Sequence, residues 1–173
     1  MSRPDLRLLA TAALAFALAG CASVEPLAIA APDTRGVSIA APRCAWSLDS
    51  VRDARSAEDQ GRVGLRAVTV EDVTGMIAAA TREALGDAHG PAFSLELLKA
   101  YAATRRVSEM YVIALRVHVG DESFIVRGQS TGMYWTDSEG GLRDAAREAL
   151  ANTMRELVKS LDSRCGSTAA ASP

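Results

Sequence analysis

The strongest constraint on the fold is the alternation of apolar residues over residues 110–119. Every second position there is apolar, namely Tyr111, Ile113, Leu115, Val117 and Val119. A period of two is typical of a strand with one buried face. Gly-Asp-Glu at 120–122 predicts a turn, and residues 123–135 are expected to return as the hairpin partner, with Gly128 and Gly132 as possible bulge positions.

Further elements flank this hairpin. Residues 44–55 predict a first strand, and residues 93–102 predict another with Phe93, Leu95, Leu97 and Tyr101 on one face. Residues 69–72 fit a capping box before a helix with an apolar stripe, and residues 142–161 carry a second apolar stripe at helical spacing. The order β-α-β-β-β-α favours an α+β two-layer sandwich, with an antiparallel sheet and both helices on one face.

The N-terminus has the organisation of a leader. Residues 8–18 are apolar but are shorter than the roughly 20 residues of a spanning helix. Leu18-Ala19-Gly20-Cys21 resembles the lipobox of bacterial prolipoproteins. The resemblance implies a signal peptide over residues 1–20 and lipid attachment at Cys21; the alternative is an ordinary leader with an incidental cysteine. Ala22 in place of Asp favours, by the same resemblance, the outer membrane and a domain facing the periplasm.

Composition shifts set the predicted boundaries. Residues 21–43 are rich in Ala and Pro and predict a tether, within which residues 36–40 could pair as an edge strand. The domain is expected over residues 44–165, followed by a disordered tail over residues 166–173.

With Cys21 assigned to lipid, two cysteines remain, Cys44 and Cys165. They stand near the two ends of the domain, and disulfides persist on the oxidising side of the membrane. We expect one disulfide between them, the alternative being two unpaired buried cysteines. Two cysteines and two scattered histidines do not have the spacing of a metal site, so no metal is expected.

The charge pattern excludes some partners. The chain carries a formal charge of −2, and loss of Arg3, Arg7 and Asp5 with the leader leaves about −3. No block of Lys and Arg is present, which argues against nucleic acid as a partner.

Enzymatic motifs are weak. Residues 128–132 match G-x-S-x-G around Ser130, but a nucleophile elbow lies on a strand-to-helix turn and needs a later histidine, and none follows His118. No phosphate-binding loop or cofactor motif is present, so we expect no enzyme and no cofactor.

One polar surface is a candidate for binding. Arg116, His118, Arg127 and Gln129 alternate with the apolar rows of the hairpin, so strand alternation predicts that all four lie on one side. A solvated sheet face is the plain interpretation, and a surface for a protein partner is the sharper one.

A family resemblance supports this picture. The chain resembles the YajG-type envelope lipoproteins in the order of its features behind the lipobox. These are Asp53-Ala54-Arg55, a loop with Gly61 and Gly64, a helix from near Glu71, a central hairpin and a C-terminal helix. The strand order is also similar to that of the LPS-assembly lipoprotein LptE. The resemblance implies a non-enzymatic, lipid-anchored accessory or scaffold that binds an envelope protein. The alternative is an auxiliary component of a transport system that holds a lipid or other amphiphile between sheet and helices.

Overall fold

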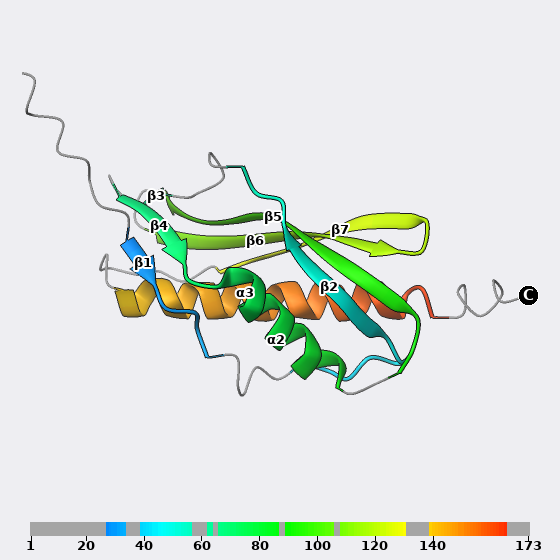
Figure 1. The fold of residues 1–173 in the computed structure, drawn as a ribbon. Helices are drawn as coiled ribbons and strands as arrows, with labels where there is room; N and C mark the ends of the chain where they lie inside the picture. Colours follow the sequence, from blue (N-terminus) through cyan, green and yellow to red (C-terminus); the bar gives the residue numbers. More distant parts are fainter. Residues whose placement is uncertain are drawn as a thin grey trace, which may run out of the picture.

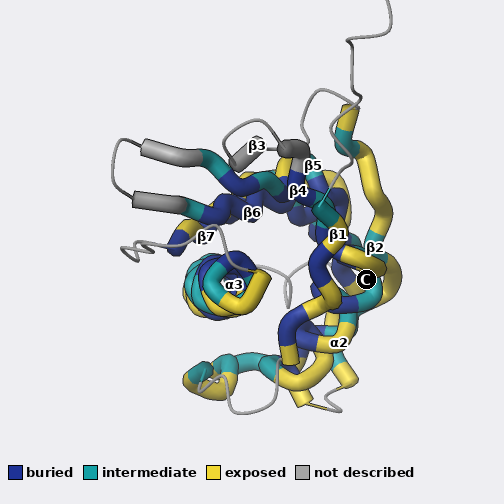
Figure 2. Tube along the Cα trace, turned by 90° about the vertical axis from the view of Figure 1, so that its left-hand side faces the viewer, coloured by how far each residue is buried: buried dark blue, intermediate teal, exposed yellow. Residues whose placement is uncertain are grey.

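The predicted α+β sandwich is confirmed. The computed structural model describes residues 27–33, 39–56, 62–63, 66–86, 89–105, 108–130 and 139–165. Its strands form one layer, and the helices α2 (Val73–Leu85) and α3 (Glu139–Asp162) form the other (Figure 1). Figure 2 shows the sheet curving over α3, with α2 beside it on the same side.

The central strands run antiparallel, as the alternation predicts. These are β5 (Ala92–Arg105), β6 (Ser108–Val119) and β7 (Glu122–Gln129). The apolar row of β6 is buried throughout, from Tyr111 to Val119. Gly120 has φ 55°, a conformation that glycine adopts without a steric cost, and it turns the chain from β6 into β7.

The prediction for one face of β5 is wrong at Tyr101. Phe93, Leu95 and Leu97 are buried as expected, but the register shifts between Leu97 and Lys99. This bulge inserts one residue, so Ala100 and Ala102 take the core positions and Tyr101 pairs with Val112 on the other face.

The sheet is mixed rather than wholly antiparallel. The strand β2 (Ser47–Asp53) pairs with β5 in parallel, because the helix α2 provides the crossover between them. The strands β3 (Arg62–Val63) and β4 (Arg66–Val70) extend the sheet, and β1 (Leu27–Ile29) pairs with β4 in parallel. Ile29 is fully buried, so part of the range predicted as a tether belongs to the folded core.

The first helix begins later than the capping box predicts. Thr69 belongs to β4, and the N-cap is Asp72, whose side chain accepts a hydrogen bond from the Gly75 N–H. Asp72 adopts the left-handed region with φ 43°, which Asp tolerates better than most residues. The pairing of β4 with β1 extends through Val70 and therefore prevents an earlier start.

Gly128 allows close packing of α3 on β7 and does not form a bulge. It pairs in regular register with Ile113. A Cβ at this position would lie 2.3 Å from the Thr153 backbone N and 2.4 Å from the Ala149 backbone O. Only glycine therefore fits between this strand and the helix.

The predicted disulfide between Cys44 and Cys165 is confirmed. Their Cα atoms are 6.0 Å apart across a sequence separation of 121 residues. The Arg43 N–H also donates to Asp162 Oδ1 at 2.7 Å. These two links fasten the chain before β2 to the end of α3.

Several predictions lie outside the described residues. They concern the leader over residues 1–20, Cys21, residues 131–135 of the expected hairpin partner, the tail over residues 166–173, Gly61, Gly64 and Gly132. The edge strand proposed over residues 36–40 lies partly outside them, and Ile39 and Ala40 are not in a strand.

Candidate functional site

The four residues predicted for the partner surface lie on the same face of the hairpin. Arg116 pairs with Ile125 and His118 pairs with Ser123, while Arg127 pairs with Ala114 and Gln129 pairs with Val112. Paired residues share a face, so these side chains project away from the helices. We call this side of β2 and β5–β7 the outer sheet face. Its use in binding remains a prediction.

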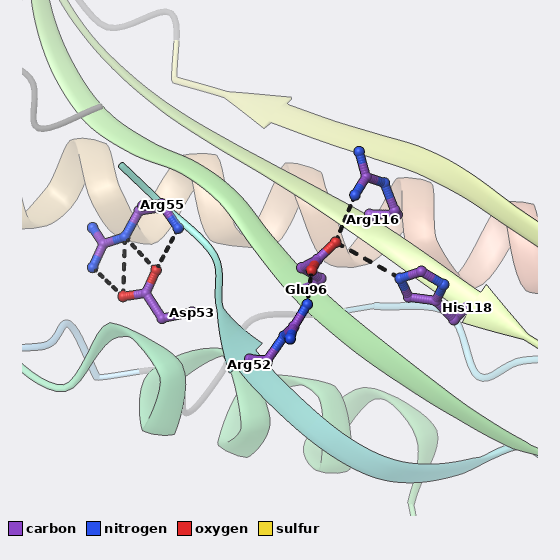
Figure 3. Close-up of polar contacts among 6 residues, drawn as sticks. All are labelled: Arg52, Asp53, Arg55, Glu96, Arg116 and His118. Atoms are coloured by element: carbon purple, nitrogen blue, oxygen red, sulfur yellow. Dashed lines mark hydrogen bonds and ion pairs between the residues drawn. The ribbon is translucent and has the colours of Figure 1, made fainter. Parts of the chain in front are cut away.

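Glu96 lies at the centre of this face. It is on β5, and its side chain is only 10% exposed. Figure 3 shows its carboxylate between Arg52 on β2 and Arg116 and His118 on β6. Arg52 donates a hydrogen bond to Oε1, and Arg116 Nη1 donates to Oε2 at 2.7 Å. His118 Nε2 lies 3.8 Å from the same Oε2.

The two arginines keep Glu96 ionised. The hydrogen bond from Arg52 is the largest effect, and together with Arg116 it lowers the pKa of Glu96 against the opposing effect of burial. Glu96 in turn fixes the directions of Arg116 and His118, so these two predicted surface residues have a structural partner.

Ile125, Arg127 and Gln129 make fewer contacts. The Ile125 side chain is the exposed large hydrophobic residue of the described part, at 62%. Arg127 is exposed, and its guanidinium has no ion pair with any described residue. The Gln129 carbonyl accepts a hydrogen bond from Asn152 Nδ2 at 2.7 Å, while its side chain is exposed.

The outer sheet face carries a positive charge that the chain as a whole does not. Among the strand residues whose side chains the structure describes, register places Arg52, Lys99, Arg116 and Arg127 on it against Glu96, a formal sum of 4 − 1 = +3. Asp49, in the bulge of β2, accepts a hydrogen bond from the Ser50 hydroxyl beside this face and reduces the sum to +2. The whole chain has a charge of −2. The face therefore complements an acidic surface.

A hollow of about 310 Å³ adjoins Glu96 on this face. Ser50 and Arg52 of β2 line one side of it, and His118 lines another. Its lining therefore includes hydroxyl, guanidinium and imidazole groups, of which the Ser50 hydroxyl donates to Asp49 and the Arg52 guanidinium donates to Glu96.

The Asp-x-Arg segment of the family resemblance forms a separate ion pair. Arg55 donates to both oxygens of Asp53 at the end of β2, with Nε to Oδ1 at 3.0 Å and Nη2 to Oδ2 at 2.7 Å (Figure 3). This side-chain hydrogen bond lowers the pKa of Asp53, and burial acts against it. Among the described residues, no hydrogen bond or ion pair joins Asp53 or the Arg55 side chain to Glu96.

Ser130 has a structural role in the fold. It is 1% exposed, and its Oγ accepts a hydrogen bond from the Tyr111 N–H at 2.7 Å. Ser130 N–H donates in turn to the Tyr111 carbonyl at 2.9 Å. Burial raises the pKa of the Tyr111 phenol, so it stays protonated. In the part of the chain that the structure describes, no cluster of His, Cys, Asp and Glu could hold a metal ion.

Sequence reasoning did not identify Glu96, Arg52 or Ile125. A carboxylate between Leu95 and Leu97 is a visible signal, because alternation places it on the polar face of β5. Its partners depend on the register of β5 with β6 and on the parallel pairing of β2, which the sequence does not reveal.

Comparisons with known proteins identify no family. No family model matches the chain, and no curated protein matches its sequence. A solved structure titled "Crystal structure of uncharacterized protein" is similar with a TM-score of 0.38 and 6% identity, over 82% of this chain and 100% of that one. A similarity this weak supports no argument. None of the described helices is long and apolar enough to cross a membrane.

Proposed function

We propose that this protein is a lipid-anchored lipoprotein of the outer membrane that faces the periplasm. It acts without catalysis, as an accessory or scaffold in envelope assembly or transport. It binds an envelope protein through the outer sheet face. The partner presents carboxylates to Arg127 and an apolar contact to Ile125.

The anchoring part rests on the sequence. Leu18-Ala19-Gly20-Cys21 follows a short apolar run and supplies the thiol for a thioether to lipid. The disulfide between Cys44 and Cys165 supports an oxidising compartment, because such bonds are rare in the cytosol.

The binding part rests on one observation, the exposed and positively charged part of the outer sheet face around Ile125 and Arg127. Both helices pack on the opposite side of the sheet (Figure 2). Ile125 is 62% exposed on β7, the edge strand of the sheet, next to Arg116 and Arg127. An exposed apolar side chain surrounded by cations is typical of a protein interface with a polar rim.

The test uses a photo-crosslinking amino acid at position 125 in cells. A specific adduct with one envelope protein is expected, and Arg127→Glu should reduce its yield. The matched control is Arg147→Glu, which reverses an exposed arginine on α3 that lies 3.6 Å from Asp144. Equal yields in Arg127→Glu and Arg147→Glu, or adducts with many unrelated proteins, would contradict the proposal.

Carriage of an amphiphile between sheet and helices is the alternative function. It requires an internal cavity, and the described interior is filled with large buried side chains such as Trp46, Phe93 and Met154. The filled interior therefore favours binding of a protein partner over carriage of an amphiphile between sheet and helices.

A further inference from the structure

An apolar crevice lies between residues 39–43 and the C-terminal half of α3. Its volume is about 360 Å³, which falls within the range of roughly 300–1,000 Å³ found for small-molecule sites. Ile39, Ala40 and Val158 contribute its apolar lining. It shares no lining residue with the hollow beside Glu96, so it is a separate site.

The wall of the crevice is held in place. Arg43 N–H donates to Asp162 Oδ1 at 2.7 Å, and the next residue, Cys44, is bonded to Cys165 just beyond α3. A hydrogen bond to a carboxylate and a covalent bond therefore fasten residues 43–44 to the end of the helix. The crevice is a built feature of the fold.

Cations surround the apolar lining. Arg43, Arg155 and Lys159 contribute to the crevice against one carboxylate, Asp162. Asp162 already accepts the Arg43 N–H, and Lys159 lies 3.7 Å from Glu156 at exposed positions. The guanidinium groups of Arg43 and Arg155 have no hydrogen-bond or ion-pair partner in the described part of the chain.

We propose that this crevice binds a single-chain anionic amphiphile. The hydrocarbon chain lies against Ile39, Ala40 and Val158. The head group, a carboxylate or a phosphate monoester, accepts hydrogen bonds from Arg43 and Arg155, because a planar guanidinium matches the oxygens of either group. This site is independent of partner binding at the outer sheet face, since the two share no residue.

The test uses residues 22–173 with the disulfide intact and without lipid. Every described contact lies within residues 27–165, so removal of residues 1–21 breaks none of them. The fluorescent probe is dansylaminoundecanoate, below its micelle concentration. The competitors are decanoate, decyl phosphate, decyltrimethylammonium and inorganic phosphate. Saturable binding at one site is expected, with displacement by decanoate, decyl phosphate or both. Displacement by only one of them identifies the head group, and displacement by both shows that the site accepts either.

Two variants locate the site. Ala40→Trp fills the crevice from an exposed position and should abolish probe binding, whereas Ala41→Trp, at the exposed neighbour outside the lining, should not. Arg155→Glu should weaken binding by about tenfold or more, the size of a lost charged hydrogen bond, and Arg147→Glu on the same helix should not.

Several outcomes would overturn the proposal. They are absence of saturable binding, equal binding by Ala40→Trp and Ala41→Trp, and equal binding by Arg155→Glu and Arg147→Glu. Equal displacement by decyltrimethylammonium would show that the cations have no role. Displacement by inorganic phosphate alone would show a simple anion site.

Discussion

Gly128→Ala should destabilise the protein strongly because α3 lies directly against β7. The added Cβ would be 2.3 Å from the Thr153 N and 2.4 Å from the Ala149 O. Carbon atoms in ordinary contact are about 3.5 Å or more from their neighbours, so the helix and strand must separate by about 1 Å. Both atoms belong to the helix backbone and cannot rotate away, unlike the end of a flexible side chain.

The expected cost is at the upper end of the overpacking range, about 3 kcal/mol. For a domain of this size, at about 4 °C per kcal/mol, the melting temperature should fall by about 12 °C. Urea unfolding of residues 22–173, followed by circular dichroism, measures the free energy of unfolding with its m value.

Gly140→Ala is the matched control. Gly140 lies in the first turn of α3, and its Cβ would meet nothing within 4 Å. Alanine has the higher helix propensity, so stability should be unchanged or rise by less than about 1 kcal/mol. If Gly128→Ala stays within about 0.5 kcal/mol of the parent with the same m value, the close approach of α3 to β7 is refuted.

Four further predictions concern anchoring, the disulfide, the buried serine and the ion cluster. Cys21→Ser should leave an uncleaved precursor that does not partition into detergent, as intact mass and phase separation will show. Mass spectrometry without reductant should find one linked peptide pair containing Cys44 and Cys165, and reduction should lower stability by at most about 4–5 kcal/mol, a value that chain entropy sets for so long a loop. Ser130→Ala should cost about 1–3 kcal/mol in urea unfolding, because a buried N–H loses its acceptor, but should leave partner crosslinking intact. The pKa of Glu96 is lowered in the folded state, so ionised Glu96 stabilises the fold at a pH above the pKa of an unfolded glutamate. This stabilisation is lost as the pH falls through the folded pKa. The free energy of unfolding should therefore decline less steeply with acid in Glu96→Gln than in the parent.

The elements that the sequence predicts well are those whose pattern is local. The row from Tyr111 to Val119 repeats strictly and has no interruption, so its strand and buried face follow directly. The long C-terminal helix is equally clear, because its apolar stripe repeats at helical spacing over residues 142–161.

The elements that the sequence does not predict depend on distant partners. Leu27–Ile29 is too short and too close to prolines to indicate a strand, and it becomes one because β4 offers a free edge. The bulge after Leu97 has no residue signature, yet it moves Tyr101 to the outer face. The parallel pairing of β2 is fixed by the packing of α2 and not by any residue within the strand.

Glu96 divides the predicted partner surface into two parts with different uses. Arg116 and His118 surround a carboxylate that is 10% exposed, so reversing Arg116 would bring two acidic groups together and leave Glu96 with fewer donors. Such a variant would lose stability as well as binding, and it cannot test the surface alone. Arg127 has no ion pair among the described residues and can be reversed with little cost to folding. The experiment that separates binding from stability therefore changes Arg127 and leaves Arg116 in place.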